Sequence, residues 1–342
     1  MKNPLRTLKR VIRQPVDRFE RTLLLRRLLD QQFTQAGVTP PKVRFVYSRQ
    51  VRLRSDALIL REPAAFVVHI SQETSTSQLR FLGPRIAPFV RWFSRTGQEI
   101  RRISVNLSDG HEPSEATYRF STTPNVGAPV PDPYYFVTRG YQRIRETATK
   151  QSAPWRDRTD EIVWRGAPNN TGFFSLDPDL ASNPAVMQRL RLVLACRNLD
   201  IDAQFFGGGN PQVRHLIKTA GLAGDFIPPE RWLNMKYAID IDGFTNAWNN
   251  FMQRLLLGCC ILKVESQHGF YQWYYPELKP WEHFVPVRAD LADLAEKAEW
   301  VRSNQGRAEE IAMTGQAFAR SMTLESETAR AAQIIEENEM QT

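Results

Sequence analysis

The sequence of 342 residues is long enough for one large core or two domains of ordinary size. Its hydrophobic fraction of 42% and charged fraction of 24% are typical of a folded globular protein and exclude wholesale disorder. The net charge of +8 is a modest basic excess, and no nucleic-acid-binding motif accompanies it, so we expect no nucleic acid partner.

The basic excess is concentrated at the N-terminus, where apolar side chains alternate with basic ones at roughly helical spacing. This pattern predicts a basic amphipathic helix over residues 1–35. Two interpretations stay open: the helix rests on an anionic membrane surface, or it packs on its own domain, interrupted by Pro15. The basic residues are Lys2, Arg6, Lys9, Arg10, Arg13, Arg18, Arg21, Arg26 and Arg27.

The expected location follows from cysteine usage and from the lack of long apolar runs. Only Cys196, Cys259 and Cys260 occur, two of them adjacent in an apolar stretch, which suits reduced core residues. No apolar run approaches the ~20 residues that cross a bilayer, and the N-terminus lacks the apolar core of a secretory signal. We expect a cytoplasmic protein, attached peripherally to the inner face of the membrane if the N-terminal helix contacts lipid.

The N-terminal half shows short strand-like segments at 43–53, 64–70 and 103–107, which predict an α/β domain over residues 36–150. The stretch 122–135 contains four prolines and a glycine. Because proline removes a hydrogen-bond donor, this stretch is unsuited to a helix or a central strand. We expect it to form a loop over a cleft between two domains.

The second half predicts a parallel sheet. Strand-like runs occur at 161–166, 203–206, 237–241 and 260–264, with a helical segment at 185–195 and another at 251–257. The last helix lies between two strands, which is a βαβ unit, and ligands bind at the carboxyl ends of such strands. We expect a second α/β domain over 151–290, followed by helices over 291–342.

Polar residues follow three of these predicted strands. Arg165, Gly166 and Ala167 end the first, and an arginine fork beside backbone N–H groups can bind a diphosphate, although an ordinary turn is the commoner role of Arg-Gly. Asp242 and Gly243 end the third. Glu265 and Ser266 follow the fourth, where ribose hydroxyls are expected.

Asp109 and His111 lie in a turn after the strand at 103–107. A turn aspartate most often caps local backbone groups. The alternative role is that of a general base, which must reach the attacking hydroxyl within hydrogen-bond distance.

No metal site is expected. The five histidines show no ligand spacing, and Asp240-Ile241-Asp242 belongs to a strand and not to a metal-binding loop.

Three segments together resemble glycosyltransferase family 90, which includes lipopolysaccharide-modifying enzymes and protein O-glucosyltransferases. They are Lys236-Tyr-Ala-Ile-Asp-Ile-Asp-Gly243, Leu255-Leu-Leu-Gly-Cys-Cys-Ile-Leu-Lys-Val264 and Tyr274-Tyr-Pro-Glu-Leu-Lys-Pro-Trp281. The resemblance covers roughly residues 100–320. It implies that Arg165, Gly166 and Ala167, with Asp242 and Gly243, lie in the donor-nucleotide site, and that Asp109 matches the general base.

The chain departs from the family pattern at two donor-side positions. Asn250 stands where many relatives carry an arginine that meets the donor diphosphate, and Gln272 stands where relatives carry an acidic residue. An amide cannot supply the missing charge. These substitutions affect the expected identity of the sugar more than the expected fold.

The resemblance implies a GT-B arrangement, in which two Rossmann-like domains face one another across a cleft. It implies an inverting, metal-independent enzyme without a cofactor that moves a sugar from a UDP-sugar donor to a hydroxyl. We expect the acceptor to be a glycan or lipid-linked saccharide of a lipopolysaccharide core or capsule. The alternatives are a protein O-glycosyltransferase and a non-catalytic protein that binds a nucleotide sugar or a membrane surface.

Overall fold

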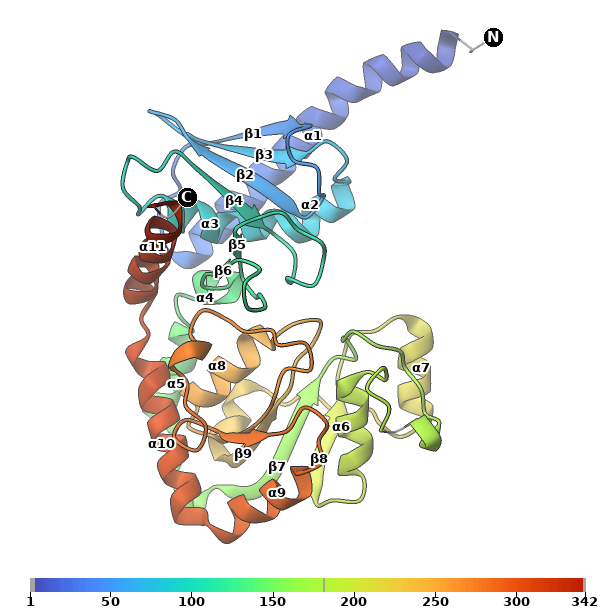
Figure 1. The fold of residues 1–342 in the computed structure, drawn as a ribbon, viewed down its shortest axis with the longest axis vertical. Coiled ribbons are helices and arrows are strands. Elements are labelled where there is room, and N and C mark those ends of the chain that lie inside the picture. The colour runs from blue at the N-terminus through green and yellow to red at the C-terminus, as the bar shows by residue number, and fades with distance from the viewer. Residues whose placement is uncertain (1–3, 181, 341–342) are drawn as a thin grey trace. The chain divides into compact units, whose positions relative to one another are not determined.

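The computed structural model describes residues 4–180 and 182–340, with side chains from residue 18 onward except at position 178. The chain divides into two compact units (Figure 1). Unit 1 contains the residues up to Arg139 together with those from Leu324 on, and unit 2 runs from Gly140 to Thr323. The division therefore falls before the predicted boundary at residue 150, and the last helix belongs to the first unit.

Unit 1 is built on a mixed six-stranded sheet in the order β1-β3-β2-β4-β5-β6. Strand β2 is antiparallel to both of its neighbours, whereas the other pairs are parallel, so this sheet is not of the simple Rossmann type. Its elements are α1 (Pro4–Ala36), β1 (Val43–Ser48), β2 (Asp56–Arg61), β3 (Phe66–Ser71), α2 (Thr76–Leu82), η1 (Gly83–Arg85), α3 (Ile86–Phe93), β4 (Arg102–Asn106), β5 (Tyr118–Arg119), β6 (Ala128–Pro129), α4 (Pro133–Val137) and α11 (Leu324–Met340).

The proline-rich stretch is more ordered than the predicted loop. Strand β6 lies within it and helix α4 begins in it. Pro133 occupies the first turn of α4, where a missing N–H costs nothing, and the Asp132 carboxylate accepts hydrogen bonds from the N–H groups of Tyr134 and Tyr135. Asp132 followed by Pro133 is a sequence signal for the start of a helix. The number of prolines in the stretch favoured a loop over this signal.

Helix α1 is continuous through Pro15 and packs on unit 1 over its second half. Leu25, Leu29 and Phe33 recur every four residues and are fully or almost fully buried. The helix contacts α2, α3, α4 and β1. Residues 25–36 of α1 therefore pack on their own domain, as the second interpretation of this helix predicts.

Unit 2 contains a five-stranded sheet in the order β11-β10-β9-β7-β8, and every pair is parallel. Strands β9 and β10 are buried at every residue, because helices cover both faces of a doubly wound sheet. Its elements are α5 (Gln142–Gln151), β7 (Thr159–Gly166), α6 (Gln188–Cys196), β8 (Ile201–Phe205), α7 (Pro211–Thr219), β9 (Met235–Asp240), α8 (Trp248–Leu256), β10 (Cys260–Val264), β11 (Val285–Val287), α9 (Leu294–Ser303) and α10 (Gln305–Ser321).

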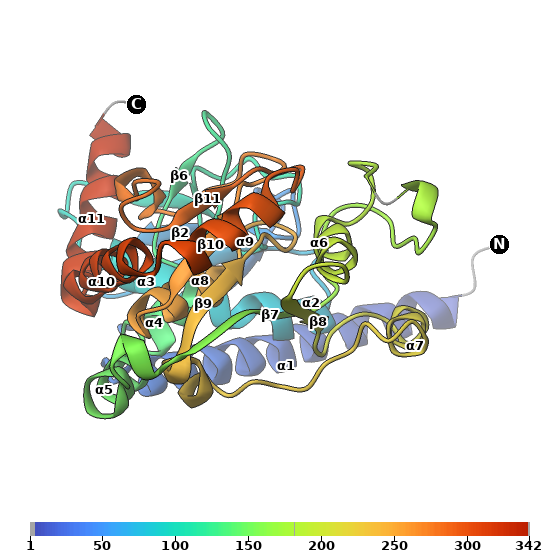
Figure 2. The same cartoon turned by 90° about the horizontal axis from the view of Figure 1, so that it is seen from below.

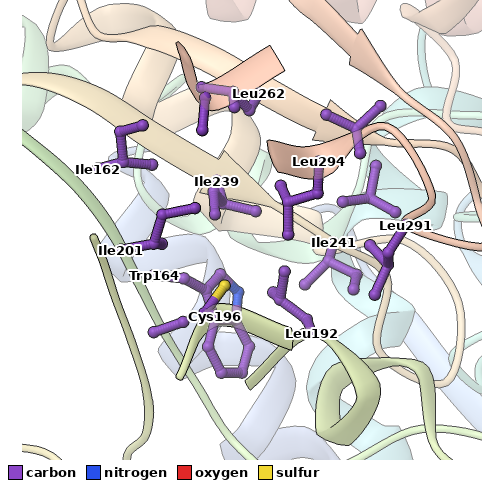
Figure 3. Close-up of a cluster of buried hydrophobic side chains, with 14 of the residues drawn as sticks. Ile162, Trp164, Leu192, Cys196, Ile201, Ile239, Ile241, Leu262, Leu291 and Leu294 are labelled. Carbon is purple, nitrogen blue, oxygen red and sulfur yellow. The ribbon is translucent and has the colours of Figure 1, made fainter. Parts of the chain in front are cut away.

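The core of unit 2 lies between this sheet and the helices α6, α9 and α10. Ile162, Ile239 and Leu262 project from three strands toward Leu192 and Leu294 of two helices (Figure 3). All three cysteines are free and buried, and burial raises the pKa of the Cys196 thiol to about 12. The predicted α/β class, with two sheets and C-terminal helices, is confirmed. That the two units face one another across a cleft stays a prediction from the resemblance.

The three C-terminal helices, α9, α10 and α11, are labelled in Figure 2, and they are divided between the two units. Helices α9 and α10 complete unit 2, whereas α11 packs on α3 of unit 1. The hydroxyl of Tyr118 donates to the Ile335 carbonyl at 3.1 Å and to Glu339 at 3.0 Å. Helix α11 is thus an integral part of unit 1. No helix within residues 4–180 and 182–340 is both long and apolar enough to cross a membrane.

Leu262 provides a test of the unit 2 core. We expect Leu262→Ala to lower the free energy of unfolding by about 2–5 kcal/mol, because the side chain is completely buried and its removal leaves a cavity. Urea denaturation followed by circular dichroism measures the change. Leu216→Ala is the matched control, since Leu216 is 45% exposed. Equal effects of the two substitutions would contradict the described core.

Candidate functional site

The sheet of unit 2 has a point at which the strand order reverses. Numbered by sequence, its strands run 2-1-3-4-5, so the chain leaves β7 in one direction and β9 in the other. In open sheets of this order, ligands bind outside the carboxyl ends of the two central strands. Gly166 ends β7, and Asp242 follows β9 after one residue. Two of the predicted segments therefore meet at the expected binding position.

Arg189 of α6 connects the ends of these two strands. Its Nε donates to the Asp242 carbonyl at 2.8 Å and its Nη2 to the Ile241 carbonyl at 3.2 Å. Its Nη1 donates to the Ala167 carbonyl at 3.0 Å and to the amide oxygen of Asn169. The strand ends are thus fixed relative to one another by one guanidinium. Arg189 was not among the candidates drawn from the sequence.

The charge of Arg189 is buried without a directly bound counter-ion among the described residues. Its side chain is 5% exposed, and all four hydrogen-bond acceptors are neutral oxygens. Burial lowers the pKa of the guanidinium to about 10, which leaves it charged at neutral pH. Gly243 gives it room, because a Cβ there would lie 3.1 Å from Nη2. The strand ends therefore carry a fixed positive charge suited to an anion.

Asp242 lies beside this arginine and is almost completely buried. Burial raises the pKa of its carboxyl to about 6, although Lys263 and hydrogen bonds from Ser266 and Asn246 favour the ionised form. Its backbone carbonyl also accepts a hydrogen bond from the side chain of Asn170 at 3.3 Å. The loops after β7, β9 and β10 thus converge on one residue.

Asp240 takes part in an ion pair and not in a cluster of metal ligands. Its Oδ2 lies 2.8 Å from Nζ of Lys263, and both side chains are buried. The ammonium also sits over the rings of Phe251 and Tyr275, 4.5 and 4.7 Å from their centres. Among the described residues, no group of three or more candidate ligands is assembled. Metal independence stays a prediction.

The guanidinium of Arg165 is bound by other protein groups and is not free to contact a ligand at the strand ends. Its Nη2 lies 2.6 Å from Oδ2 of Asp202 on the neighbouring strand β8, and its Nε donates to the Asp225 carbonyl. Its Nη1 donates to the carbonyls of Trp164 and Asp202. Four of its five N–H donors are occupied, so direct contact with a ligand requires that the pair with Asp202 opens.

The remaining donor-side candidates differ in how accessible they are. Glu265 is exposed and Ser266 half-buried at the carboxyl end of β10, next to β9. Asn250 is half-buried in the first turn of α8. Gln272 has no exposed surface, and its amide oxygen accepts a hydrogen bond from the Tyr274 hydroxyl at 3.4 Å. The structure therefore places Gln272 in the core.

An aromatic pair at the same edge of the sheet was not predicted. Phe206 follows β8, and its N–H donates to the Gly166 carbonyl at 2.9 Å. Its ring lies 5.2 Å from that of Phe226, and the two side chains are 43% and 57% exposed. The glycines of 207–209 lack the spacing of a phosphate loop, so by themselves they indicate only a flexible turn. The informative signal was the phenylalanine that precedes them.

Asp109 lies in unit 1, in the turn after β4, and its side chain is 26% exposed. Arg85, at the end of η1, donates to its Oδ1 at 2.6 Å and to the Leu107 carbonyl at 2.9 Å. The arginine also stacks on Phe81, 4.1 Å from the ring centre. Asp109 is therefore a partly accessible carboxylate with a fixed orientation.

These features define unit 2 as a doubly wound α/β domain with a candidate anion-binding site at its strand ends. Residues 137–329 match the model of Glycosyl transferase family 90. The match spans more than half of the chain and takes in every strand of unit 2, so the chain belongs to this family. Asp109 lies outside the matched range.

Known proteins of this kind share limited segments with the chain. It is 32% identical over 183 residues to Protein O-glucosyltransferase 3 of Rattus norvegicus, covering 49% of this chain and 29% of that protein. It is 38% identical over 128 residues to Protein O-glucosyltransferase 3 of Homo sapiens, covering 33% and 24%. The matched segments thus span less than a third of either relative.

One solved structure shows a weak overall likeness. Sucrose-phosphate synthase from Thermosynechococcus elongatus is 12% identical, with 92% of each chain covered and a TM-score of 0.42. A likeness of this size carries no argument about activity.

The pKa of Asp242 generates a pH-dependent prediction. Because the folded carboxyl retains its proton to a higher pH than the unfolded one, the stability of the protein falls as pH rises from about 4 to 6. Asp242→Asn removes this loss, which amounts to about 3 kcal/mol. We expect the stability of the variant relative to the original protein to rise by up to that amount between pH 4 and 7.

Urea unfolding at both pH values measures the difference. Asp200→Asn is the control, since the Asp200 side chain is 99% exposed. A difference for Asp242→Asn that does not change with pH would contradict the raised pKa.

Proposed function

We propose that the chain is an inverting glycosyltransferase that moves a sugar from a UDP-sugar to a hydroxyl group without a metal ion. The observation that carries the proposal is the family match over residues 137–329, which takes in the ligand site at the ends of β7 and β9. The UDP donor and the inverting course follow from the resemblance of the strand-end segments to the family.

Arg189 is the group that we propose attracts the donor diphosphate. It supplies a buried positive charge in a chain whose Asn250 stands where many relatives carry an arginine, and low exposure strengthens the attraction. Ala167 and Gly243 border this guanidinium, and Arg165 and Gly166 end strand β7.

Two further features extend the donor site on either side of the diphosphate. The exposed pair Phe206 and Phe226 offers a face on which the nucleobase stacks. On the other side, Glu265 and Ser266 offer oxygens to sugar or ribose hydroxyls.

Asp109 is the proposed general base. In the transfer, the acceptor oxygen forms a bond to the anomeric carbon while the bond from that carbon to the diphosphate breaks. The hydroxyl proton passes to Asp109 and the nucleoside diphosphate leaves with its electron pair. Arg85 orients the carboxylate through the 2.6 Å contact.

The acceptor that the comparisons favour is a protein hydroxyl. Two of the proteins that this chain resembles are named protein O-glucosyltransferases, which supports the alternative more than the saccharide acceptor that we expected. The proposal therefore names a serine or threonine hydroxyl, with a saccharide as the competitor in the same assay.

The donor site generates a binding prediction. We expect Arg189→Met to weaken UDP binding at least tenfold, because a charge-assisted contact contributes about 1.5–3 kcal/mol. Calorimetric titration with UDP, GDP and CMP, without added metal, measures it. Arg165→Ala tests the assignment from the resemblance in the same experiment.

Arg254→Met is the matched control for this substitution. Arg254 is equally buried, burial lowers its pKa to about 10, and it stacks on Trp232. If both methionine variants are folded by circular dichroism and lose UDP affinity equally, Arg189 has no particular role in the donor site.

The transfer reaction generates a second prediction. Labelled UDP-sugars are incubated with a serine- and threonine-containing polypeptide and, separately, with saccharides, and incorporation of label is measured. We expect label in the polypeptide, and a loss of about 10²–10⁴-fold in Asp109→Asn with UDP affinity unchanged. Glu112→Gln is the nearby control.

Three outcomes count against parts of the proposal. Label in saccharide alone refutes the protein acceptor, and unchanged transfer by Asp109→Asn refutes the base. UDP binding without transfer to any acceptor supports a non-catalytic family member.

A further inference from the structure

Two apolar side chains of α1 are exposed although the helix packs on its own unit. Phe19 is 65% exposed and Leu23 is 48% exposed, whereas Leu25, Leu29 and Phe33 are buried. At about 100° per residue, Phe19 and Leu23 lie roughly a quarter turn away from the buried stripe. Packing on unit 1 therefore leaves a second apolar face of the helix uncovered.

This second face borders a groove against the edge of the unit 1 sheet. Strand β1 is the last strand on its side of the sheet, and Phe45, Val46 and Tyr47 from this strand line the groove opposite Phe19 and Leu23. Arg18 and Arg26 lie along its helical side. The groove thus combines an apolar interior with exposed arginines.

The sequence continues the same face toward the N-terminus. In the sequence, Leu8, Ile12 and Val16 precede Phe19 and Leu23 at intervals of three or four residues, the spacing typical of the apolar stripe of an amphipathic helix. Residues 1–27 contain nine lysines and arginines but only Asp17 and Glu20, a net charge of +7 out of +8 for the chain. Nearly all of the excess charge therefore accompanies this apolar face.

We propose that this face of α1, with the groove beside it, docks on an anionic lipid membrane. Phe19 and Leu23 enter the boundary between headgroups and acyl chains, and the arginines contact lipid phosphates. Both components are needed, because an apolar face alone does not distinguish lipids and exposed charge alone binds weakly at physiological salt. The proposal is independent of the donor and acceptor, since it uses no residue of the ligand site.

Vesicle co-sedimentation of the full chain tests the proposal. Vesicles of phosphatidylcholine alone are compared with vesicles that also contain phosphatidylglycerol, at low and at physiological salt. We expect binding to the anionic vesicles only, weakened by salt. Each basic side chain near such a surface contributes about fivefold, so Arg18→Gln with Arg26→Gln should lower the partition coefficient more than tenfold.

The apolar contribution is tested by Phe19→Ser with Leu23→Ser. Both side chains are exposed, so the pair should keep the melting temperature while reducing binding at least tenfold. Met313→Ser with Leu216→Ser is the matched control in unit 2, at 65% and 45% exposure.

Three results would overturn the proposal. They are no binding to anionic vesicles, equal binding to both vesicle types, and unchanged binding of the serine pair at helix α1. A dimer in solution that dissociates on Phe19→Ser with Leu23→Ser would instead identify a second copy of the chain as the occupant of this face. UDP titration of the same samples separates a membrane defect from a donor-site defect.

Discussion

The ligand site of unit 2 depends on one buried guanidinium. Arg189 contacts the strand ends on both sides of the reversal in strand order, with three backbone carbonyls and one amide as acceptors. Burying a charge is costly, and hydrogen bonds to neutral oxygens offset only part of that cost. The carboxylates of Asp240 and Asp242 act on it only through space, so an anion at the strand ends would supply a directly bound counter-charge. The same contacts therefore fix the strand ends relative to one another and place a positive charge beside them.

Two other cationic side chains near the strand ends, Lys263 and Arg165, are paired with carboxylates, whereas Arg189 has no directly bound carboxylate among the described residues. Lys263 is neutralised by Asp240 at 2.8 Å, and Arg165 by Asp202 at 2.6 Å. Burial raises the pKa of Asp242 to about 6, so its carboxylate is the nearby negative charge most easily lost when an anion binds. Protonation of Asp242 would remove its repulsion of the bound anion. The site can thus adjust its own charge without moving the backbone.

The sequence predicted the strands of unit 2 well and the contacts between them poorly. Cys260–Val264 is observed as predicted, because a buried parallel strand is a continuous apolar run that ends at a polar residue. Arg189 could not be found in this way, since it lies in an ordinary helical segment and acts on Asp242, 53 residues away. Gln272 shows the converse: its position in a family motif predicts contact with the donor, which stays a prediction, while the structure buries its side chain completely. Local pattern therefore located the strand ends, while long-range packing decided which side chains reach them.

The proposed membrane surface and the proposed donor site would attract their anions in different ways, one through exposed and screened charge and the other through a buried charge at contact distance. Residues 1–27 hold a net +7, so the rest of the chain carries a net charge of only +1 and exerts little long-range attraction on a nucleotide. Exposed arginines such as Arg18 and Arg26 act across water and are screened by salt within about 8–10 Å. Arg189 acts at contact distance in a site of low exposure, where screening is weak. Raising the ionic strength should therefore release the N-terminal surface from an anionic membrane well before it affects a diphosphate at the strand ends.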